Sequence, residues 1–193
     1  YIQLLEEAKK QGDERLKLVM ETICATGIRV SELPFITAEA VRAGRAVVNC
    51  KNKKRVIFIP SKLQRILKEY MKRKNITEGA VFLTRTGTVL NRSNIWRAMK
   101  KLSQTAGVEC RKVFPHNLRH LFAKTFYSAG KDLAKLADVL GHSHIETTRI
   151  YIMESGQEHE RIMEQLGLVE TDSDLFFLQG NRKRRREKWK QLK

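Results

Sequence analysis

The chain has 193 residues, and its 38 Lys and Arg against 21 Asp and Glu give it a net charge of +17. A hydrophobic content of 41% is enough for a folded core, which excludes a wholly disordered chain. No apolar run approaches the roughly 20 residues of a membrane span, and the N-terminus lacks a signal-peptide pattern, so we expect a soluble, cytoplasmic protein. The three cysteines are odd in number and far apart, which favours ordinary thiols over disulfides or a metal clip. Because the chain opens on Tyr1 rather than Met, we expect a fragment.

The basic charge is concentrated in two segments. Residues 42–124 hold 21 basic and 3 acidic residues and residues 181–193 hold 8 and 1, whereas residues 1–41 and 125–180 are net acidic. A basic block that also carries regular apolar patterning indicates a folded face that neutralises phosphates. The arginine-rich tail is either an additional DNA-binding arm, a helix that orders on a partner, or a disordered tail.

The first elements are predicted from apolar spacing and from Gly and Pro. Residues Asp13–Thr26 are predicted to form a helix that ends at Gly27, followed by a short helical segment over 28–33. The β-prone runs 46–50 and 55–59 predict a hairpin whose tip is Lys51–Lys54. Next we expect a helix that begins at Pro60-Ser61 with Leu63, Ile66, Leu67 and Tyr70 on one face, a strand over Val81–Thr84 with a turn at Gly87, and a helix over Asn91–Ala106.

From Pro115 onward the pattern is helical almost throughout. The predicted helices are His116–Ala129, Asp132–Leu140 ended by Gly141, Ile145–Ile152, and Gln157–Leu166 ended by Gly167. The chain is therefore predicted to be mainly α with one small antiparallel β-sheet, an α+β fold.

Two motifs place arginines beside helix ends. In TGIRVSEL (26–33), Arg29 follows a helix-ending glycine and Glu32 lies within helical reach to orient it. In PHNLRH (115–120), His116 and Arg119 share one face near a helix N-terminus, which favours anions. Taken singly, these residues indicate a surface ion pair or a non-catalytic phosphate grip rather than catalysis.

A third motif, LGHSHIETTRIY (140–151), carries a histidine and a tyrosine nine residues apart. His142 follows a helix-ending glycine, and Tyr151 lies about two and a half helical turns further on. A lone tyrosine there is usually a core residue, and His142 taken alone could simply cap the end of a helix. We assign Tyr70 and Tyr127 to the core and expect no chemical role for His120 or His144.

Together the three motifs resemble, in order, spacing and flanking residues, those of the tyrosine recombinase family of phage-integrase-like and Xer-like site-specific DNA recombinases. The resemblance covers roughly residues 12–168. It implies a tyrosine recombinase catalytic domain over 1–168 and a C-terminal segment over 169–193, in which Leu175–Leu178 could dock on a neighbouring protomer. It also implies an N-terminal core-DNA-binding domain in the full-length protein, which this chain does not supply.

The resemblance also implies a set of site residues. Arg29, His116, Arg119 and His142 would surround the scissile phosphate, Tyr151 would be the nucleophile and Glu32 a supporting acid. The family's hairpin lysine is expected at Lys51, with Lys53 or Lys54 as alternatives because the turn is one residue shorter than usual. We expect further DNA contacts from Lys53, Lys54, Arg55, Arg92, Arg97, Lys100, Lys101, Arg111 and Lys112.

The chemistry explains why these residue types are needed. Two permanently charged guanidinium groups stabilise the charge of phosphodiester transfer, so we expect no cofactor and no metal. A phenol of ordinary pKa about 10 needs a proton acceptor, for which His116 is suited, and a hairpin lysine can protonate the leaving 5′-oxygen. The resemblance implies a 3′-phosphotyrosyl intermediate that a second DNA 5′-hydroxyl attacks, without ATP.

The hypothesis is therefore a DNA integrase or recombinase, and two alternatives stay open. One is a non-catalytic DNA-binding module of the same fold, and the other is DNA relaxation by a type IB topoisomerase. The expected partners are double-stranded DNA and a homo-tetramer on two DNA sites, with no membrane and no small-molecule substrate. The expected location is the nucleoid of a prokaryotic cytoplasm.

Overall fold

The computed structural model describes residues 1–50, 53–151 and 163–166. By its internal contacts the chain divides into two units, Tyr1–Ile152 and Met153–Lys193. Almost all the described residues belong to the first unit, and the account below concerns that unit. The predicted C-terminal segment 169–193, with its basic tail, lies outside the described residues, as does most of the predicted helix Gln157–Leu166.

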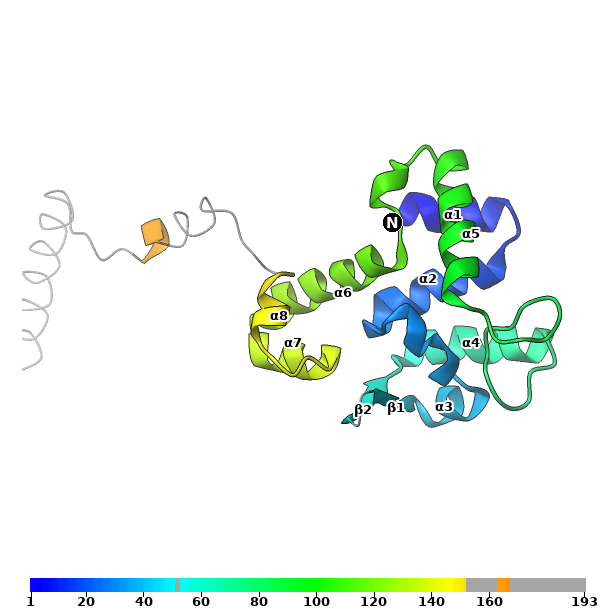
Figure 1. Cartoon of the computed structure of the whole chain (residues 1–193), viewed down its shortest axis with the longest axis horizontal. Helices are drawn as coiled ribbons and strands as arrows, with labels where there is room; N and C mark the ends of the chain where they lie inside the picture. The colour runs from blue at the N-terminus through cyan, green and yellow to red at the C-terminus, as the bar shows by residue number, and fades with distance from the viewer. Residues whose placement is uncertain (51–52, 152–162, 167–193) are drawn as a thin grey trace, which may run out of the picture. The chain divides into compact units, whose positions relative to one another are not determined.

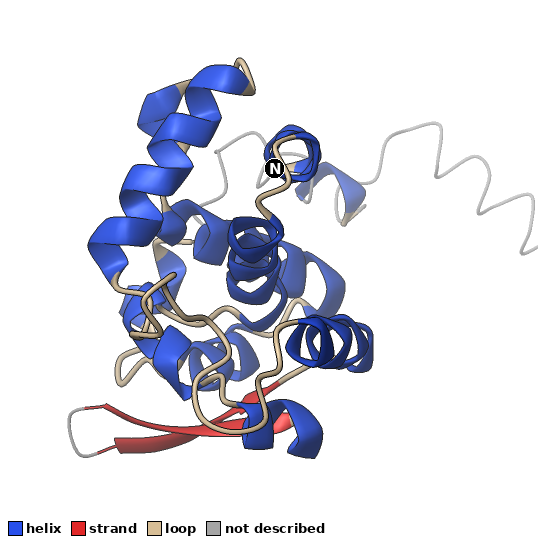
Figure 2. Cartoon of the chain, turned by 90° about the vertical axis from the view of Figure 1, so that its right-hand side faces the viewer, coloured by secondary structure: helices blue, strands red, loops and turns tan. Residues whose placement is uncertain are grey.

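The described elements are mostly helical (Figure 1). In chain order they are α1 (Ile2–Lys10), α2 (Glu14–Thr26), the 3-10 helix η1 (Val30–Phe35), α3 (Ala38–Ala43), β1 (Arg45–Cys50), β2 (Lys53–Phe58), α4 (Ser61–Arg73), α5 (Arg92–Thr105), the 3-10 helix η2 (Cys110–Lys112), α6 (Pro115–Gly130), α7 (Leu133–Leu140) and α8 (Glu146–Arg149). Figure 2 shows the two-stranded antiparallel sheet lying along one side of the helices. The predicted α+β fold, mainly helical with one small sheet, is confirmed.

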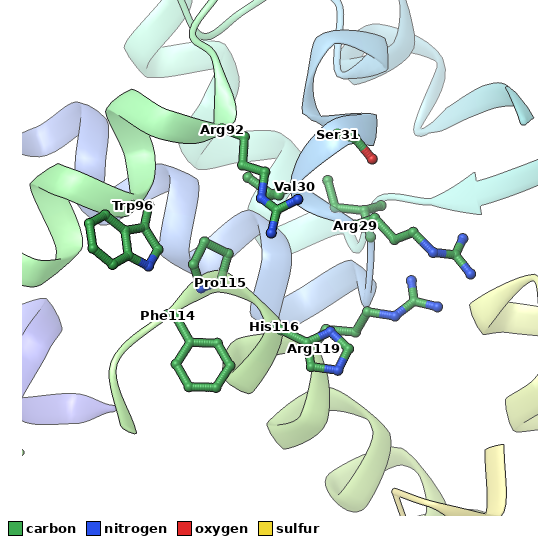
Figure 3. A pocket seen from close by; sticks show the side chains of 10 residues that line it. Arg29, Val30, Ser31, Arg92, Trp96, Phe114, Pro115, His116 and Arg119 are labelled. Atoms are coloured by element: carbon green, nitrogen blue, oxygen red, sulfur yellow. The ribbon is translucent and has the colours of Figure 1, made fainter. Parts of the chain in front are cut away.

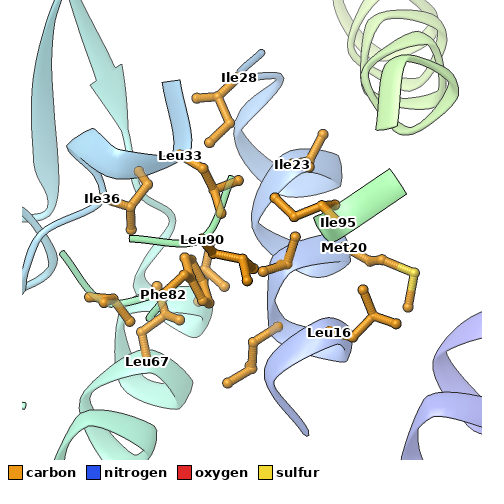
Figure 4. Close-up of a cluster of buried hydrophobic side chains, with 14 of the residues drawn as sticks. Leu16, Met20, Ile23, Ile28, Leu33, Ile36, Leu67, Phe82, Leu90 and Ile95 are labelled. Carbon is orange, nitrogen blue, oxygen red and sulfur yellow. The ribbon is translucent and has the colours of Figure 1, made fainter. Parts of the chain in front are cut away.

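Helix α2 is the centre of the domain. The side chain of Asp13 caps its first turn by accepting a hydrogen bond from the Leu16 amide (3.0 Å), and Gly27 ends it in the left-handed conformation. The helix packs against α1, α4, α5 and α6, so it is buried on several sides. Figure 4 shows part of the resulting core around α2. The first predicted helix is therefore confirmed with its cap residues.

The hairpin is confirmed, but its tip is shorter than predicted. Strand β2 begins at Lys53, which pairs with Cys50, and Lys54 pairs with Asn49. Lys53 and Lys54 are thus strand residues rather than part of the turn, because the ladder continues to the residue before the connection. The connection itself, residues 51–52, lies outside the described residues.

Other local predictions were wrong. Residues 81–84 form no strand and make only an isolated bridge, Leu83 with Val89. Helix α8 ends at Arg149 rather than Ile152. The short helix α3 and the N-terminal helix α1 were not predicted.

A second, smaller apolar cluster lies between α6 and α7. Its buried members are Ala123, Leu136, Leu140 and Tyr151, and Phe122, Phe126 and Tyr127 pack against it. Tyr70 is buried in the main core, as predicted, and Tyr127 is half-buried. Among the described residues, no helix is long and apolar enough to cross a membrane.

The end of α2 yields a stability prediction. Gly27 has φ +65°, and a Cβ there would overlap the ring of Phe122 on α6, whereas a Cβ on Gly12 (φ +68°) would meet nothing within 4 Å. Both alanine variants carry the left-handed strain, but only Gly27→Ala must also displace a packed ring. We expect Gly27→Ala to lower the free energy of unfolding by about 1–3 kcal/mol more than Gly12→Ala does. Urea unfolding of the two variants measures the difference, and equal losses would contradict the predicted overlap.

Candidate active site

Arg119 on α6 is the buried centre of the site. Its side chain is only 2% exposed, yet it carries a charge. Its Nη1 donates to the Gly27 carbonyl (2.5 Å), at the end of α2, and its Nη2 donates to the Leu140 carbonyl (2.8 Å), in the last turn of α7. Carbonyls at helix C-termini favour a cation, which explains how the guanidinium is held without a carboxylate. These hydrogen bonds join all three sequence motifs.

Arg29 is fixed by Glu32, as the sequence predicted. Glu32 is fully buried within a short 3-10 helix. Its carboxylate accepts hydrogen bonds from the Arg29 backbone amide (2.7 Å) and from the Arg29 guanidinium (3.1 Å). This reciprocal cap starts the 3-10 helix η1 directly after the turn at Gly27. The Arg29 side chain stays 40% exposed, so its charged end is held in place while facing outward.

His142 is positioned by the end of α7. Gly141 adopts φ +67°, and the His142 amide donates to the Ala137 carbonyl (3.0 Å), which is a Schellman arrangement. The ring lies between Arg119 Nη2, 3.0 Å from its Nε2, and Thr148 Oγ1, 2.8 Å from its Nδ1. Because a guanidinium only donates, Nε2 must accept, and Nδ1 then carries the proton that is donated to Thr148. This network assigns a neutral imidazole.

Tyr151 lies among three imidazole rings. Its side chain is 6% exposed, and ring-centroid distances are 4.2 Å to His120, 5.7 Å to His142 and 5.8 Å to His116. The eight residues between His142 and Tyr151 do not form one continuous helix, because α8 covers only Glu146–Arg149. The structure thus brings the predicted tyrosine and the two predicted histidines together.

Burial first, and then neighbouring positive charge, lowers the pKa values of the histidines at the site. For His116 the pKa is lowered by burial first, then by Arg119 and Arg29; for His142 the same causes, together with Arg55, lower the pKa to about 4. The pKa of His120 is lowered by burial and then by His116. Burial also lowers the pKa of Arg119, to about 10, and the neighbouring Tyr151 hydroxyl opposes that shift. All three imidazoles are therefore protonated less readily than a free histidine.

A pocket of about 320 Å³ opens beside these groups. Figure 3 shows the guanidinium ends of Arg29 and Arg119 pointing the same way, with the ring of His116 beside Arg119. Arg92, Trp96 and Phe114 line the other side of the pocket. Its walls combine cations with aromatic faces, which suits a phosphate and the sugar or base attached to it.

The remaining predicted residues occupy different places. Lys51 lies outside the described residues, and so does the side chain of Lys53. Exposed side chains are those of Lys54, Arg92, Arg97, Lys101, Arg111 and Lys112, of which Lys112 pairs with Glu109 (2.7 Å). Lys100 is half-buried and donates to the Cys110 carbonyl. Arg55 was predicted as a surface DNA contact, but its side chain turns inward and pairs with Glu32.

Sequence reasoning missed two residues of this cluster. His120 was expected to do nothing chemical, yet its ring is the one that lies nearest to Tyr151. Its position in the sequence gave a signal, because His120 follows His116 by four residues and so shares its helix face. Thr148 was not singled out, although its buried hydroxyl binds His142; no local pattern marks such a contact. Among the described residues, no three His, Cys, Asp or Glu side chains are grouped to hold a metal ion.

Comparison with known proteins gives consistent matches. Residues 1–158 match the profile of the Phage integrase family. The chain is 32% identical over 147 residues to tyrosine recombinase XerD of Oceanobacillus iheyensis, covering 71% of this chain and 49% of that protein. It is 35% identical over 148 residues to tyrosine recombinase XerC of Roseiflexus castenholzii, covering 71% and 46%. The crystal structure of XerA recombinase superposes with a TM-score of 0.70 at 25% identity, over 88% of this chain and 62% of that one. The chain spans about half the length of the curated relatives it matches.

The lowered pKa of His142 yields a pH prediction. Between about pH 6.5 and pH 4 an unfolded histidine binds a proton that folded His142 does not, so the unfolding free energy falls as the pH falls through this window. NMR titration of the His142 ring protons should give a midpoint near 4 in the DNA-free protein. In urea unfolding at pH 7 and pH 5, His142→Gln should lose less stability between the two pH values than the wild type. A His142 midpoint at or above 6.5 would contradict the assigned neutral ring.

Proposed function

Because this chain belongs to the phage integrase family, we propose that it is the catalytic part of a site-specific DNA recombinase that cuts and rejoins strands through a tyrosine. The observation that carries the proposal is that His116, Arg119 and His142 lie beside one tyrosine, Tyr151, while Arg29 lines the same pocket as His116 and Arg119. The relatives XerD and XerC are named tyrosine recombinases, which supports the same activity here.

In the proposed reaction, the two arginines bind the non-bridging oxygens of one phosphodiester. Arg29 approaches from the exposed side, and Arg119 approaches from within the domain. Negative charge develops on those oxygens when a fifth oxygen bonds to phosphorus, and fixed guanidinium groups stabilise it. His142 accepts a hydrogen bond from Arg119 and so helps to orient that guanidinium toward the phosphate.

The nucleophile is the Tyr151 hydroxyl. Its oxygen forms a bond to phosphorus while the bond to the 5′-oxygen of the DNA breaks, which leaves a 3′-phosphotyrosyl link. His116 accepts the phenol proton, and its lowered pKa keeps it neutral and able to do so near pH 7. His120 packs on the phenol ring and fixes its orientation. The hairpin lysine, Lys51 in this proposal, donates a proton to the leaving oxygen.

Strand exchange then follows without an external energy source. The phosphotyrosyl bond retains the energy of the broken linkage, so a 5′-hydroxyl from a second strand can attack it and release Tyr151. We further propose that the protein acts on double-stranded DNA as a tetramer on two sites, in association with the nucleoid. The exposed residues Arg92, Lys101, Arg111 and Lys112 are proposed to contact the backbone.

Replacement of the nucleophile tests the chemistry. On nicked duplexes enriched for binding from a random-sequence pool, wild-type protein should form a covalent adduct on a denaturing gel in the presence of EDTA. Tyr151→Phe keeps the ring among the histidines but has no hydroxyl, so it should bind the same duplexes and form no adduct. Tyr127→Phe is the matched control, because Tyr127 packs in the same apolar cluster.

The outcomes separate the open alternatives. No adduct from wild-type protein on duplexes that it binds tightly would point to the non-catalytic binder. An adduct that Tyr151→Phe still forms would place the nucleophile elsewhere. Relaxation of supercoiled plasmids that carry no selected site would point to topoisomerase activity.

The basic face yields a separate prediction about DNA affinity. Each phosphate neutralised on duplex DNA contributes about −0.9 to the slope of log Kobs against log salt concentration. If four to six of the exposed cations contact phosphates, the slope should be about −4 to −5. Fluorescence anisotropy between 50 and 200 mM salt measures it, and a slope near zero would contradict the predicted phosphate contacts.

A further inference from the structure

Arg55, on strand β2, does not face the surface where DNA would bind. Its side chain is 13% exposed, although its neighbours Lys54 and Val56 are exposed. Its Nη2 donates to Glu32 Oε2, and its Nη1 donates to the Val139 carbonyl. Alternation along the strand accounts for this, because successive side chains point to opposite faces and Arg55 falls on the inward face with Ile57.

The contact with Glu32 links Arg55 to Arg29. The buried Glu32 carboxylate accepts from Arg55 through one oxygen and from the Arg29 guanidinium through the other, so one anion holds two cations. A fully buried carboxylate is stable only when it is paired and hydrogen-bonded. If Arg55 were removed, Oε2 of Glu32 would lose a cationic partner and the carboxylate would draw Arg29 further inward, which would move the guanidinium proposed to bind the phosphate.

The contact with Val139 links Arg55 to His142. The Val139 carbonyl belongs to the last turn of α7, and the Arg55 stem packs so closely on Gly141 that a Cβ there would overlap it. His142 is the next residue after Gly141. A cation at a helix C-terminus is favourable. Here the same cation also holds the C-terminal end of α7 in place, and with it the position of His142.

We propose that Arg55 is a positioning residue, which ties the hairpin strand to Arg29 through Glu32 and to His142 through the end of α7. This inference rests on the proposed function. It gives the hairpin a defined place relative to the phosphate-binding groups, since β2 begins directly after the connection that contains Lys51. The same arginine therefore fixes three parts of the site that come from distant segments of the chain.

The test separates positioning from phosphate contact. Arg55→Met should lower the single-turnover rate of adduct formation at saturating DNA by about 10- to 100-fold, since small displacements of binding groups cost that much. Its salt slope should stay equal to that of the wild type. Arg55→Lys keeps a charge beside Glu32 but cannot reach both partners, so its rate should lie between those of Arg55→Met and wild type.

Two further variants serve as controls, one for the cleavage rate and one for the salt slope. Arg73→Met removes an arginine that pairs with Glu14, at the opposite end of α2 from Gly27, and its cleavage rate should not change. Lys54→Met removes an exposed cation from the same strand and should reduce the salt slope by about 0.9 if that lysine contacts a phosphate.

The inference is overturned by either of two results. A salt slope reduced by about 0.9 in Arg55→Met, with an unchanged rate at saturating DNA, would make Arg55 a phosphate contact. Unchanged rate and slope, with lower stability alone, would make it a structural residue only.

A wild-type protein that forms no adduct would instead reject the proposed function. In that case NMR still tests the link, because loss of the Arg55 charge should raise the His142 titration midpoint, and an unchanged midpoint would contradict the contact.

Discussion

The site depends on burying one positive charge, the guanidinium of Arg119, within a helical domain. Desolvating a cation is costly unless its donors are satisfied, and here carbonyls from the ends of α2 and α7 accept from it. Those two helices end where they do because Gly27 and Gly141 adopt the left-handed conformation. The glycines therefore determine where the charge lies, and the charge in turn holds the loop that presents Arg29 next to the loop that presents His142.

Among the residues that the structure describes, the site gathers more positive than negative charge. Three guanidinium groups, those of Arg29, Arg55 and Arg119, gather near one buried carboxylate, that of Glu32. Burial is the main cause of the lowered pKa values of His116 and His142, and repulsion from these arginines adds to it. A phosphodiester bound between the arginines would supply the missing negative charge, so we expect DNA binding to raise both histidine pKa values toward their ordinary range. An imidazole that is neutral before binding and more basic after it is well suited to accept the phenol proton when the substrate is present.

Local signals in the sequence predicted most of the helices, because caps are local chemistry. Helix α2 begins after the N-cap Asp13 and ends at Gly27, and α7 begins after the N-cap Asp132 and ends at Gly141. The aspartate side chains accept from backbone amides of the first turn, and the glycines adopt the left-handed conformation that ends a helix. Short elements were harder: α3 has only six residues, and α8 only four, too few for a periodic pattern. At the site, resemblance to a family indicated which residues would gather, and the structure placed those it describes together. The resemblance gave no indication that Arg55 pairs with Glu32 or that Thr148 binds His142, because both contacts join residues that no sequence pattern connects.

The two arginines proposed to bind the phosphate differ in how many of their N–H donors are already engaged. A guanidinium has five N–H groups. In Arg119 three of them are engaged, by Gly27, Leu140 and His142, and the guanidinium also interacts with the Tyr151 hydroxyl, so few donors are left for a phosphate. In Arg29 the described contacts engage one, with Glu32, and the side chain is 40% exposed. Arg119 thus offers few donors at a fixed point, whereas Arg29 offers a nearly complete fork that can close on the phosphate. In the proposed reaction, buried Arg119 would therefore define where phosphorus lies relative to Tyr151, and exposed Arg29 would supply most of the new hydrogen bonds. Binding energy would then be gained without moving the residues around the nucleophile.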